Sequence, residues 1–214
     1  MKLIALREIH YSYPSGQRVL KGLNLEVGEG EKVGIVGANG SGKTTLLHTM
    51  MGLILPNEGE VELFGALCLA EKDFREARKR MGFVFQNADD QLFCPTVAED
   101  IAFGPRNLGM DSHEAHHLVH EVMDLLEIGH LEARVTHQLS GGEKRLVAIA
   151  TVLAMKPEIL ILDEPTTGLD AVTEERVAGI LRDLVKTSIV VSHDREFLRR
   201  TVIRTVNLSD GVIK

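Results

Sequence analysis

Apolar residues divide the chain into strand-like and helix-like stretches. Residues 3–9 and 19–27 have the composition of strands and are separated by a turn at residues 14–16. The continuous apolar runs at residues 159–162 and 188–191 are typical of parallel strands buried on both faces of a sheet. Three further short strands are expected at residues 31–36, 59–64 and 81–85.

Helical stretches lie between these strands. Short helices are expected at residues 43–51, 74–80, 171–185 and 194–200. A longer helical region begins where Thr96 and Glu99 have the spacing of a capping box. Asp111 or Ser112 caps its next helix, in which apolar residues recur at helical spacing. The chain closes with an expected hairpin at residues 209–211.

The order of these elements predicts the fold class. Strands that alternate with helices around a buried parallel sheet form an α/β core. We expect a mostly parallel core sheet, an antiparallel β subdomain at the N-terminus, and a helical subdomain inserted at about residues 96–140. The chain of 214 residues is long enough for one domain with a sizeable core, so residues 1–214 are interpreted as a single domain.

Composition narrows the classes of function. The formal charge of −7 argues against a nucleic-acid partner, because proteins that bind nucleic acids usually present a basic face. Cys68 and Cys94 lack the spacing of a metal site or a disulfide framework, which favours reduced thiols in a cytosolic protein. No signal peptide is expected, and no stretch reaches the roughly 20 apolar residues that span a bilayer. Any membrane role must therefore come from a partner.

A glycine-rich segment between a strand and a helix predicts nucleotide binding. The segment matches the P-loop pattern and comprises Gly37, Ala38, Asn39, Gly40, Ser41, Gly42, Lys43, Thr44 and Thr45. Its glycines let backbone N–H groups and the positive end of the next helix approach phosphate oxygens. Lys43 should reach the β- and γ-phosphates of ATP, and the Thr44 hydroxyl should bind Mg²⁺. The alternative is a glycine-rich turn without a ligand.

Two carboxylates follow the apolar run at residues 159–162. Asp163 and Glu164 stand at the carboxyl end of a buried strand, which is the edge where α/β sheets bind ligands. We expect Asp163 to hold Mg²⁺ through water, and Glu164 to polarise the water that attacks ATP. The alternative is a pair of solvated loop acids.

A third motif, Ser140, Gly141, Gly142 and Glu143, lies between the P-loop and these carboxylates. A Ser-Gly-Gly that opens a helix either binds an anion or is a flexible cap. In this position it makes the chain resemble the ATPases of the ABC family, over nearly the whole length of the chain. The resemblance rests on five or six motifs in the family's order, a combination that is highly specific.

Four other residues extend the resemblance. Gln86 follows a strand as the family's Q-loop glutamine does, Asp170 ends a segment similar to its D-loop, and His193 matches its switch histidine. Tyr13 lies where an aromatic residue usually stacks on adenine, with Tyr11 as a competitor and core packing as the alternative. The plain alternatives are a surface amide for Gln86 and a loop histidine for His193.

The resemblance implies a head-to-tail dimer that clasps two ATP molecules. Each ATP would contact the P-loop of one chain and residues 140–143 of the other, because one P-loop leaves γ-phosphate charge uncompensated. The expected catalytic residues are Glu164, His193 and Gln86, and Gln86 joins Thr44 and Asp163 around Mg²⁺. The second subunit is either the same chain or a paralogue.

Residues 140–143 correspond to the family's signature motif, and the helix that they open, the signature helix, departs from the family at one point. The family commonly carries arginine three residues after the Gln or Glu of the signature, whereas this chain has Leu146 there and Arg145 one residue earlier. Glu143 also stands where glutamine is more frequent. These differences concern local hydrogen bonds at the start of this helix and leave the expected fold unchanged.

Residues 85–93 are the most informative for the type of ABC protein. Their sequence, FQNADDQLF, is similar to a segment of energy-coupling-factor importer ATPases, including the cobalt/nickel type. The resemblance implies that a transmembrane subunit docks near residues 86–99, where Asp89, Asp90 and Glu99 would face its basic residues. The alternative is a polar loop without a partner.

These motifs together predict an ATP-hydrolysing subunit at the cytoplasmic face of the cell membrane, held there by partner subunits. Uptake of cobalt or nickel is the specific hypothesis, and a vitamin importer of the same type is the near alternative. A soluble ABC ATPase outside transport and a non-catalytic nucleotide sensor are the rivals.

A cluster of histidines invites a metal-site interpretation. His113, His116, His117 and His120 have spacings that gather several of them on one helix face. We favour a solvated helix face, because no carboxylate or cysteine completes an obvious ligand set in the sequence.

Overall fold

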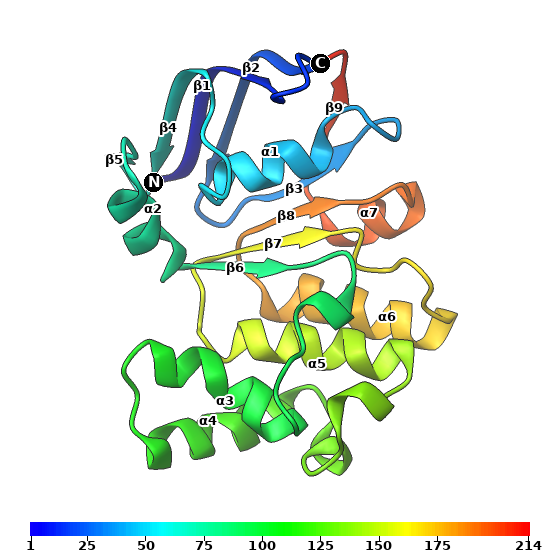
Figure 1. The fold of residues 1–214 in the computed structure, drawn as a ribbon. Coiled ribbons are helices and arrows are strands. Elements are labelled where there is room, and N and C mark those ends of the chain that lie inside the picture. Colours follow the sequence, from blue (N-terminus) through cyan, green and yellow to red (C-terminus); the bar gives the residue numbers. More distant parts are fainter.

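Two sheets form the framework of the protein, with one helix between them and the other large helices below the second (Figure 1). The computed structural model describes residues 1–214. The first sheet is antiparallel, has the order β2-β1-β4-β5, and consists of β1 (Lys2–Ser12), β2 (Arg18–Gly28), β4 (Glu58–Leu63) and β5 (Ala66–Leu67). This sheet confirms the antiparallel part expected at the N-terminus.

The second sheet is mostly parallel and has the order β10-β9-β3-β8-β7-β6. Its strands are β3 (Lys32–Val36), β6 (Met81–Val84), β7 (Ile159–Asp163), β8 (Ser188–Val191), β9 (Arg204–Ser209) and β10 (Val212–Ile213). Only β10 is antiparallel to its neighbour, in the expected hairpin. Because β3, β8, β7 and β6 are parallel neighbours, their carboxyl ends meet at one edge of the sheet.

The helices are α1 (Lys43–Met50), α2 (Glu71–Arg78), α3 (Val97–Asn107), α4 (Ser112–Leu125), α5 (Gly141–Leu153), α6 (Ala171–Gly179) and α7 (Arg195–Thr201). Figure 1 shows α1 between the two sheets, α5 and α6 beneath the parallel sheet, and α3 and α4 as a further layer below α5. This last layer is the helical insertion that the sequence predicts. None of these helices combines the length and the apolar character needed to cross a bilayer.

The buried strand β7 shows how one apolar run serves two cores. Side chains alternate between the faces of a strand. Ile159 and Ile161 therefore pack in the cluster formed with the antiparallel sheet and α1. Leu160 and Leu162 pack in the cluster formed with the helices on the other face. All five residues of β7 are buried, as the continuous apolar run predicts.

Local polar contacts decide where several helices begin. The Thr96 hydroxyl accepts a hydrogen bond from Glu99 N at 3.3 Å, and Thr96 N donates to Glu99 Oε2 at 3.0 Å, which confirms the capping box. Asp111, not Ser112, caps α4 and accepts from His113 N at 2.8 Å. The helix α2 starts three residues before the expected position, because Asp73 Oδ2 accepts backbone N–H groups of the preceding residues.

Two elements differ from the expectation. The helix predicted over residues 171–185 ends as an α-helix at Gly179 and continues as a single π-helical turn, Ile180–Leu184. The strand β9 was expected only as one side of the final hairpin, yet it also pairs in parallel with β3. Its alternating exposed residues give it a polar sequence, so the apolar pattern alone does not mark it.

Candidate nucleotide-binding site

The loop between β3 and α1 forms a cradle of backbone groups. Gly40 and Gly42 have φ angles of 75° and 103°, which side chains disfavour. A Cβ atom on Gly37 would lie 2.4 Å from the backbone oxygen of Leu208, so only glycine fits there. The buried Ser41 hydroxyl has no hydrogen-bond partner in the chain. A loop of this shape at a helix N-terminus is suited to a phosphate group.

Lys43 lies buried at the first turn of α1 and folds back over this cradle. Its ammonium group donates to Gly37 O at 2.9 Å and to Ala38 O at 3.1 Å. The backbone carbonyls hold the cation at the mouth of the loop, and no carboxylate neutralises it there. The positive charge therefore stays available for a phosphate.

A hydroxyl and a carboxylate meet beside the cradle. Thr44 Oγ1 donates to Asp163 Oδ2 at 3.0 Å and joins the start of α1 to the end of β7. Burial raises the pKa of Asp163, although the Thr44 hydrogen bond and nearby Lys43 oppose this rise. Hard oxygen atoms at this spacing, next to a phosphate cradle, match the ligands that Mg²⁺ takes from a protein and a nucleotide.

Glu164 and His193 face each other across the ends of β7 and β8. His193 Nε2 lies 3.1 Å from Glu164 Oε1, and His193 N donates to Glu164 Oε2 at 3.3 Å. Lys43 Nζ lies 3.4 Å from the same imidazole nitrogen. Glu164 has a φ angle of 46°, a strained value for a residue with a side chain, and its N–H donates to Val191 O at 2.9 Å. The strand ends thus aim both side chains at the cradle.

One cavity of about 580 Å³ collects most of the predicted residues. Its lining includes Tyr13, Asn39, Gly40, Gly42, Lys43, Thr44, Thr45, Gln86, Asp163, Glu164 and His193. The Tyr13 hydroxyl lies 2.9 Å from Thr45 Oγ1, and the residue is 39% exposed and lines the cavity. Tyr11 instead packs against the core, with its ring edge-on to that of Tyr13. Of the two tyrosines, only Tyr13 reaches the cradle.

The signature residues and Asp170 lie outside this cavity. Ser140 caps α5 and accepts from Glu143 N at 3.3 Å, while its own N–H donates to Glu143 Oε2 at 2.7 Å. These bonds lower the pKa of Glu143 and show that glutamate completes the cap here. A Cβ on Gly141 would meet no atom within 4 Å, so the helix tip is open to the surroundings. One chain therefore presents two separate helix N-termini, the start of α1 in the cavity and the start of α5 outside it.

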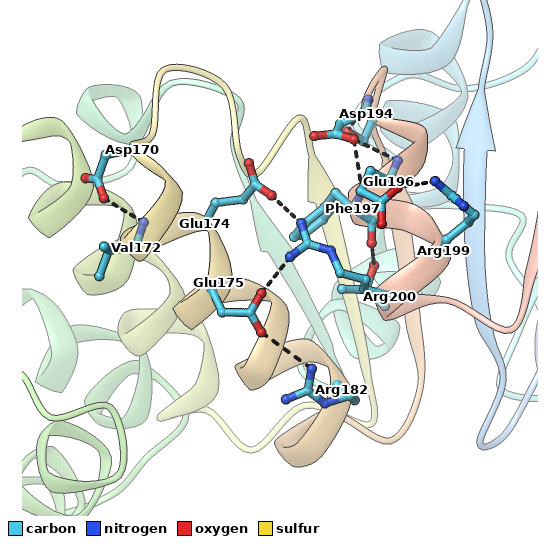
Figure 2. A network of polar contacts seen from close by, with 12 residues as sticks. Asp170, Val172, Glu174, Glu175, Arg182, Asp194, Glu196, Phe197, Arg199 and Arg200 are labelled. Atoms are coloured by element: carbon cyan, nitrogen blue, oxygen red, sulfur yellow. Dashed lines mark hydrogen bonds and ion pairs between the residues drawn. The ribbon is translucent and has the colours of Figure 1, made fainter.

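Hydrogen bonds and ion pairs connect the helices that follow Asp170 and His193 (Figure 2). Asp170 caps α6 and accepts from Val172 N at 2.9 Å, and Asp194 caps α7 in the same way. Arg200 of α7 pairs with Glu174 and with Glu175 of α6. The segments that carry Asp170 and His193 are therefore attached to a common pair of helices.

Sequence inspection missed several residues of the site. Gln17, Val19 and Thr167 also line the cavity. The D-loop-like segment contains Thr167 and offered a signal for it. Gln17 precedes β2 and Val19 lies on β2, and neither belongs to a local motif. Arg145, noted only as a departure from the family, turns out to be buried and bonded to the segment around Gln86.

The acidic residues expected to face a membrane partner are partly engaged within the chain. Asp89 Oδ1 lies 2.6 Å from Lys144 Nζ, and Glu99 serves the cap of α3. Asp90 is exposed and forms no ion pair. Asp89 and Glu99 therefore also have contacts within the chain, and the contact of all three carboxylates with a partner stays a prediction.

The histidines of α4 stack on one face of the helix. His116 and His120 are 3.2 Å apart at their Nε2 atoms, and the rings of His113 and His117 have centroids 4.5 Å apart. No group of three or more His, Cys, Asp or Glu side chains has an arrangement that could hold a metal ion. Contacts between imidazoles account for the cluster.

The parallel sheet, the cradle and the carboxylates at its edge define a P-loop nucleotide-binding protein. Residues 20–167 match the model of the family described as ABC transporter. The chain therefore belongs to this family, and within it to the ATPase subunits that couple ATP hydrolysis to transport.

Curated relatives cover almost the whole chain. A putative ABC transporter ATP-binding protein of Nitratidesulfovibrio vulgaris is 46% identical over 99% of this chain and 78% of its own length. The energy-coupling factor transporter ATP-binding protein EcfA of Methanothermobacter thermautotrophicus is 46% identical over 98% of this chain and 68% of its own length.

Solved structures share the fold. The cbiO1 protein of Clostridium perfringens, part of the ABC transporter complex cbiONQ, has a TM-score of 0.88 and 32% identity, covering 100% of this chain and 87% of its own. A dimeric bacterial ABC transporter cassette has a TM-score of 0.89 and 32% identity, covering 99% and 96%. A dimeric cassette bound to ADP and Pi has a TM-score of 0.87 and 30% identity, covering 99% and 96%. These neighbours confirm the predicted fold class.

The buried Asp163 yields a prediction about stability. The Asp163→Asn variant removes a desolvated charge and keeps an oxygen that can accept the Thr44 hydrogen bond, so it should raise the Tm of the nucleotide-free chain. Because the folded carboxyl has a raised pKa, wild-type stability falls as the pH rises through that pKa, whereas asparagine does not titrate. Melting curves at about pH 7 and about pH 5 should show a smaller difference in Tm at the lower pH. A variant that melts below the wild type at both values would contradict this.

Proposed function

We propose that this ATPase energises an importer of the energy-coupling-factor type that takes up cobalt or nickel ions. The observation that carries the proposal is the segment at residues 85–93, similar to that of such importers. Two relatives named EcfA, at 46% and 42% identity, and the likeness to cbiO1 of a cbiONQ complex support it. A vitamin importer of the same type is the second candidate, since the name EcfA specifies no solute.

The proposed reaction is attack of water on the γ-phosphorus of ATP, which gives ADP and phosphate. In this proposal the P-loop N–H groups and Lys43 hold the phosphates, while Tyr13 stacks on the adenine. Thr44 and Asp163 hold Mg²⁺, with Gln86 beside it, and the bound metal supplies positive charge to the phosphate oxygens.

Two residues act on the water and on the γ-phosphate in the proposed reaction. Glu164 orients the water and accepts its proton, since its carboxylate is buried beside the cradle and lacks a cation that would neutralise it permanently. His193 contacts both Glu164 and Lys43, so its imidazole stands where it contacts the γ-phosphate. The geometry of one chain supports each of these contacts.

The ATP-bound state is a head-to-tail dimer in this proposal. Residues 140–143 and Asp170 lie outside the nucleotide cavity of their own chain, and the tip of α5 is unobstructed. A partner chain, identical or a paralogue, would bring this tip to the γ-phosphate and add a helix N-terminus to the cradle. The dimeric cassettes among the structural neighbours support this arrangement.

We place the binding site of the transmembrane subunit, in this proposal, at a groove between α3 and α4. The groove has a volume of about 690 Å³ and is lined by both apolar and charged residues, among them Ala98, Ala102, Phe103 and Arg106. Phe93 and Phe103 stack edge-on beside it and remain 65% and 45% exposed. Exposed aromatic residues at a groove are typical of binding sites for a partner's helix. Docking there would hold the chain at the cytoplasmic face of the membrane.

The Glu164→Gln variant tests the proposed catalytic role. It should bind ATP with normal affinity, lose turnover by about a hundredfold or more, and accumulate as an ATP-bound dimer, because an amide cannot take a proton from water. Phosphate release and light scattering in ATP measure the two effects. The exposed Glu76→Gln on α2 is the matched control and should resemble the wild type. Unchanged turnover of Glu164→Gln in the complete transporter would refute the role.

Uptake in cells tests the proposed solute and the docking groove together. Cells that lack the gene should lose uptake of radioactive cobalt or nickel, and the wild-type gene should restore it. The Phe103→Glu variant should fail to restore uptake, because a charge in the groove opposes apolar docking. Leu69→Glu is the matched control, since Leu69 is 77% exposed on a distant loop.

The same cells separate the alternatives. Loss of vitamin uptake with normal cobalt and nickel uptake would establish the second candidate and contradict the first. Purification from membranes should recover a transmembrane subunit with a basic motif. Recovery of an exporter-type permease instead would contradict the importer assignment.

A further inference from the structure

Arg145 is a buried cation without a carboxylate at bonding distance. The residue is 4% exposed and forms no ion pair. Its Nη1 donates to Phe85 O at 2.6 Å and its Nη2 donates to Gln86 O at 2.5 Å, while Nε has no partner. A buried guanidinium is costly unless its surroundings satisfy it, and two backbone carbonyls do so only in part. Packing of the helix alone gives no reason for a charge at this position.

The two carbonyls belong to the segment that carries Gln86 into the nucleotide cavity. They follow β6 directly, and the guanidinium is planar, so its two bonds fix the orientation of successive peptide groups. The side chain of Gln86 receives no hydrogen bond that would orient it from within the chain. Its place in the cavity therefore depends on the backbone that Arg145 holds.

Other bonds attach the same segment to α5. Gln91 Oε1 accepts from Phe85 N at 3.1 Å, and Gln91 Nε2 donates to Ala148 O at 2.7 Å. Lys144 pairs with Asp89 at 2.6 Å. The helix α5 thus holds residues 85–91 through Lys144, Arg145 and Ala148, and its N-terminal tip is the signature segment, residues 140–143.

Two effects of opposite sign act on the charge of the Arg145 guanidinium. Burial lowers its pKa, and the negative charge of nearby Asp163 opposes that effect. Leu146, the next residue, packs in the apolar cluster and leaves Arg145 as the buried cation of this helix. The guanidinium thus extends from the signature helix to the Gln86 backbone, and the negative charge of Asp163 acts on it.

We propose that Arg145 is a positioning residue for ATP hydrolysis, which fixes the Gln86 backbone to the signature helix so that the two move as one body. A displacement of the helix tip by a bound nucleotide would then shift Gln86 in the cavity of the same chain. The reverse holds as well: a partner that moves residues 85–91 displaces the helix tip.

The test compares steady-state hydrolysis by the purified 214-residue chain with and without the guanidinium. Arg145→Met should lower kcat by about tenfold, while the Kd of a fluorescent ATP analogue changes by less than about threefold. Arg145→Lys should recover part of kcat, because an ammonium group reaches a carbonyl but cannot hold two in a fixed plane. Arg176→Met is the matched control, since Arg176 also donates to a backbone carbonyl, Leu126 O at 2.6 Å, away from the cavity. It should lower the Tm and leave kcat unchanged.

A double-mutant cycle with Gln86→Ala separates positioning from general stability. If Arg145 acts through Gln86, the loss of kcat caused by Arg145→Met should shrink to less than about twofold in the Gln86→Ala background. An unchanged kcat in Arg145→Met, or an equal fold-loss with and without Gln86, would overturn the proposal. If Arg145→Met does not fold, Arg145→Lys carries the same cycle, and its loss of kcat must likewise disappear without Gln86.

Discussion

A triphosphate carries several negative charges, and the structure is organised around holding them at one edge of a sheet. The strand order β3-β8-β7-β6 brings the P-loop, His193, Asp163 with Glu164, and Gln86 to adjacent strand ends. The cradle itself consists of backbone N–H groups and the start of α1, which require no side chain beyond glycine. Asp163 and Glu164 are buried beside it, and the Mg²⁺ of the proposed function would offset the cost of burying these charges.

The same constraint gives a physical reason for the second chain of the proposed dimer. In one chain the cradle lines the cavity without any residue of the α5 tip. That tip lies outside the cavity and has free space at Gly141. A charge that is half compensated in one chain can be fully compensated between two. Within each chain, Arg145 attaches the signature helix to the Gln86 segment, and the pair of helices α6 and α7 joins the segments of Asp170 and His193. Bonds within each chain therefore connect the signature helix to the Gln86 segment of the cavity, and the Asp170 segment to the His193 segment.

Sequence patterns were sufficient wherever the physical cause is local. The glycines of the P-loop, the apolar run that ends in Asp163 and the Thr96 cap are each specified by neighbouring residues, and all appear in the structure. Contacts between distant segments were not predictable. Nothing near Arg145 in the sequence indicates that it bonds residues sixty positions away, and nothing near Asp89 indicates Lys144. For β9, only the hairpin with β10 was predicted. Its pairing with β3 was not, because this pairing is between distant segments and leaves no apolar pattern in β9 itself.

The most direct measurement of the central claim mixes two inactive variants. Lys43→Ala impairs the cradle, and Gly141→Asp places a negative charge at a helix tip where the single chain has room for it. In a head-to-tail dimer of the two, one composite site combines an intact cradle with an intact tip. The account predicts that mixing restores ATP hydrolysis to at most about a quarter of the wild-type rate, since half of the dimers are mixed and each has one good site. No recovery on mixing, from variants that still dimerise, would contradict a nucleotide site shared between two chains.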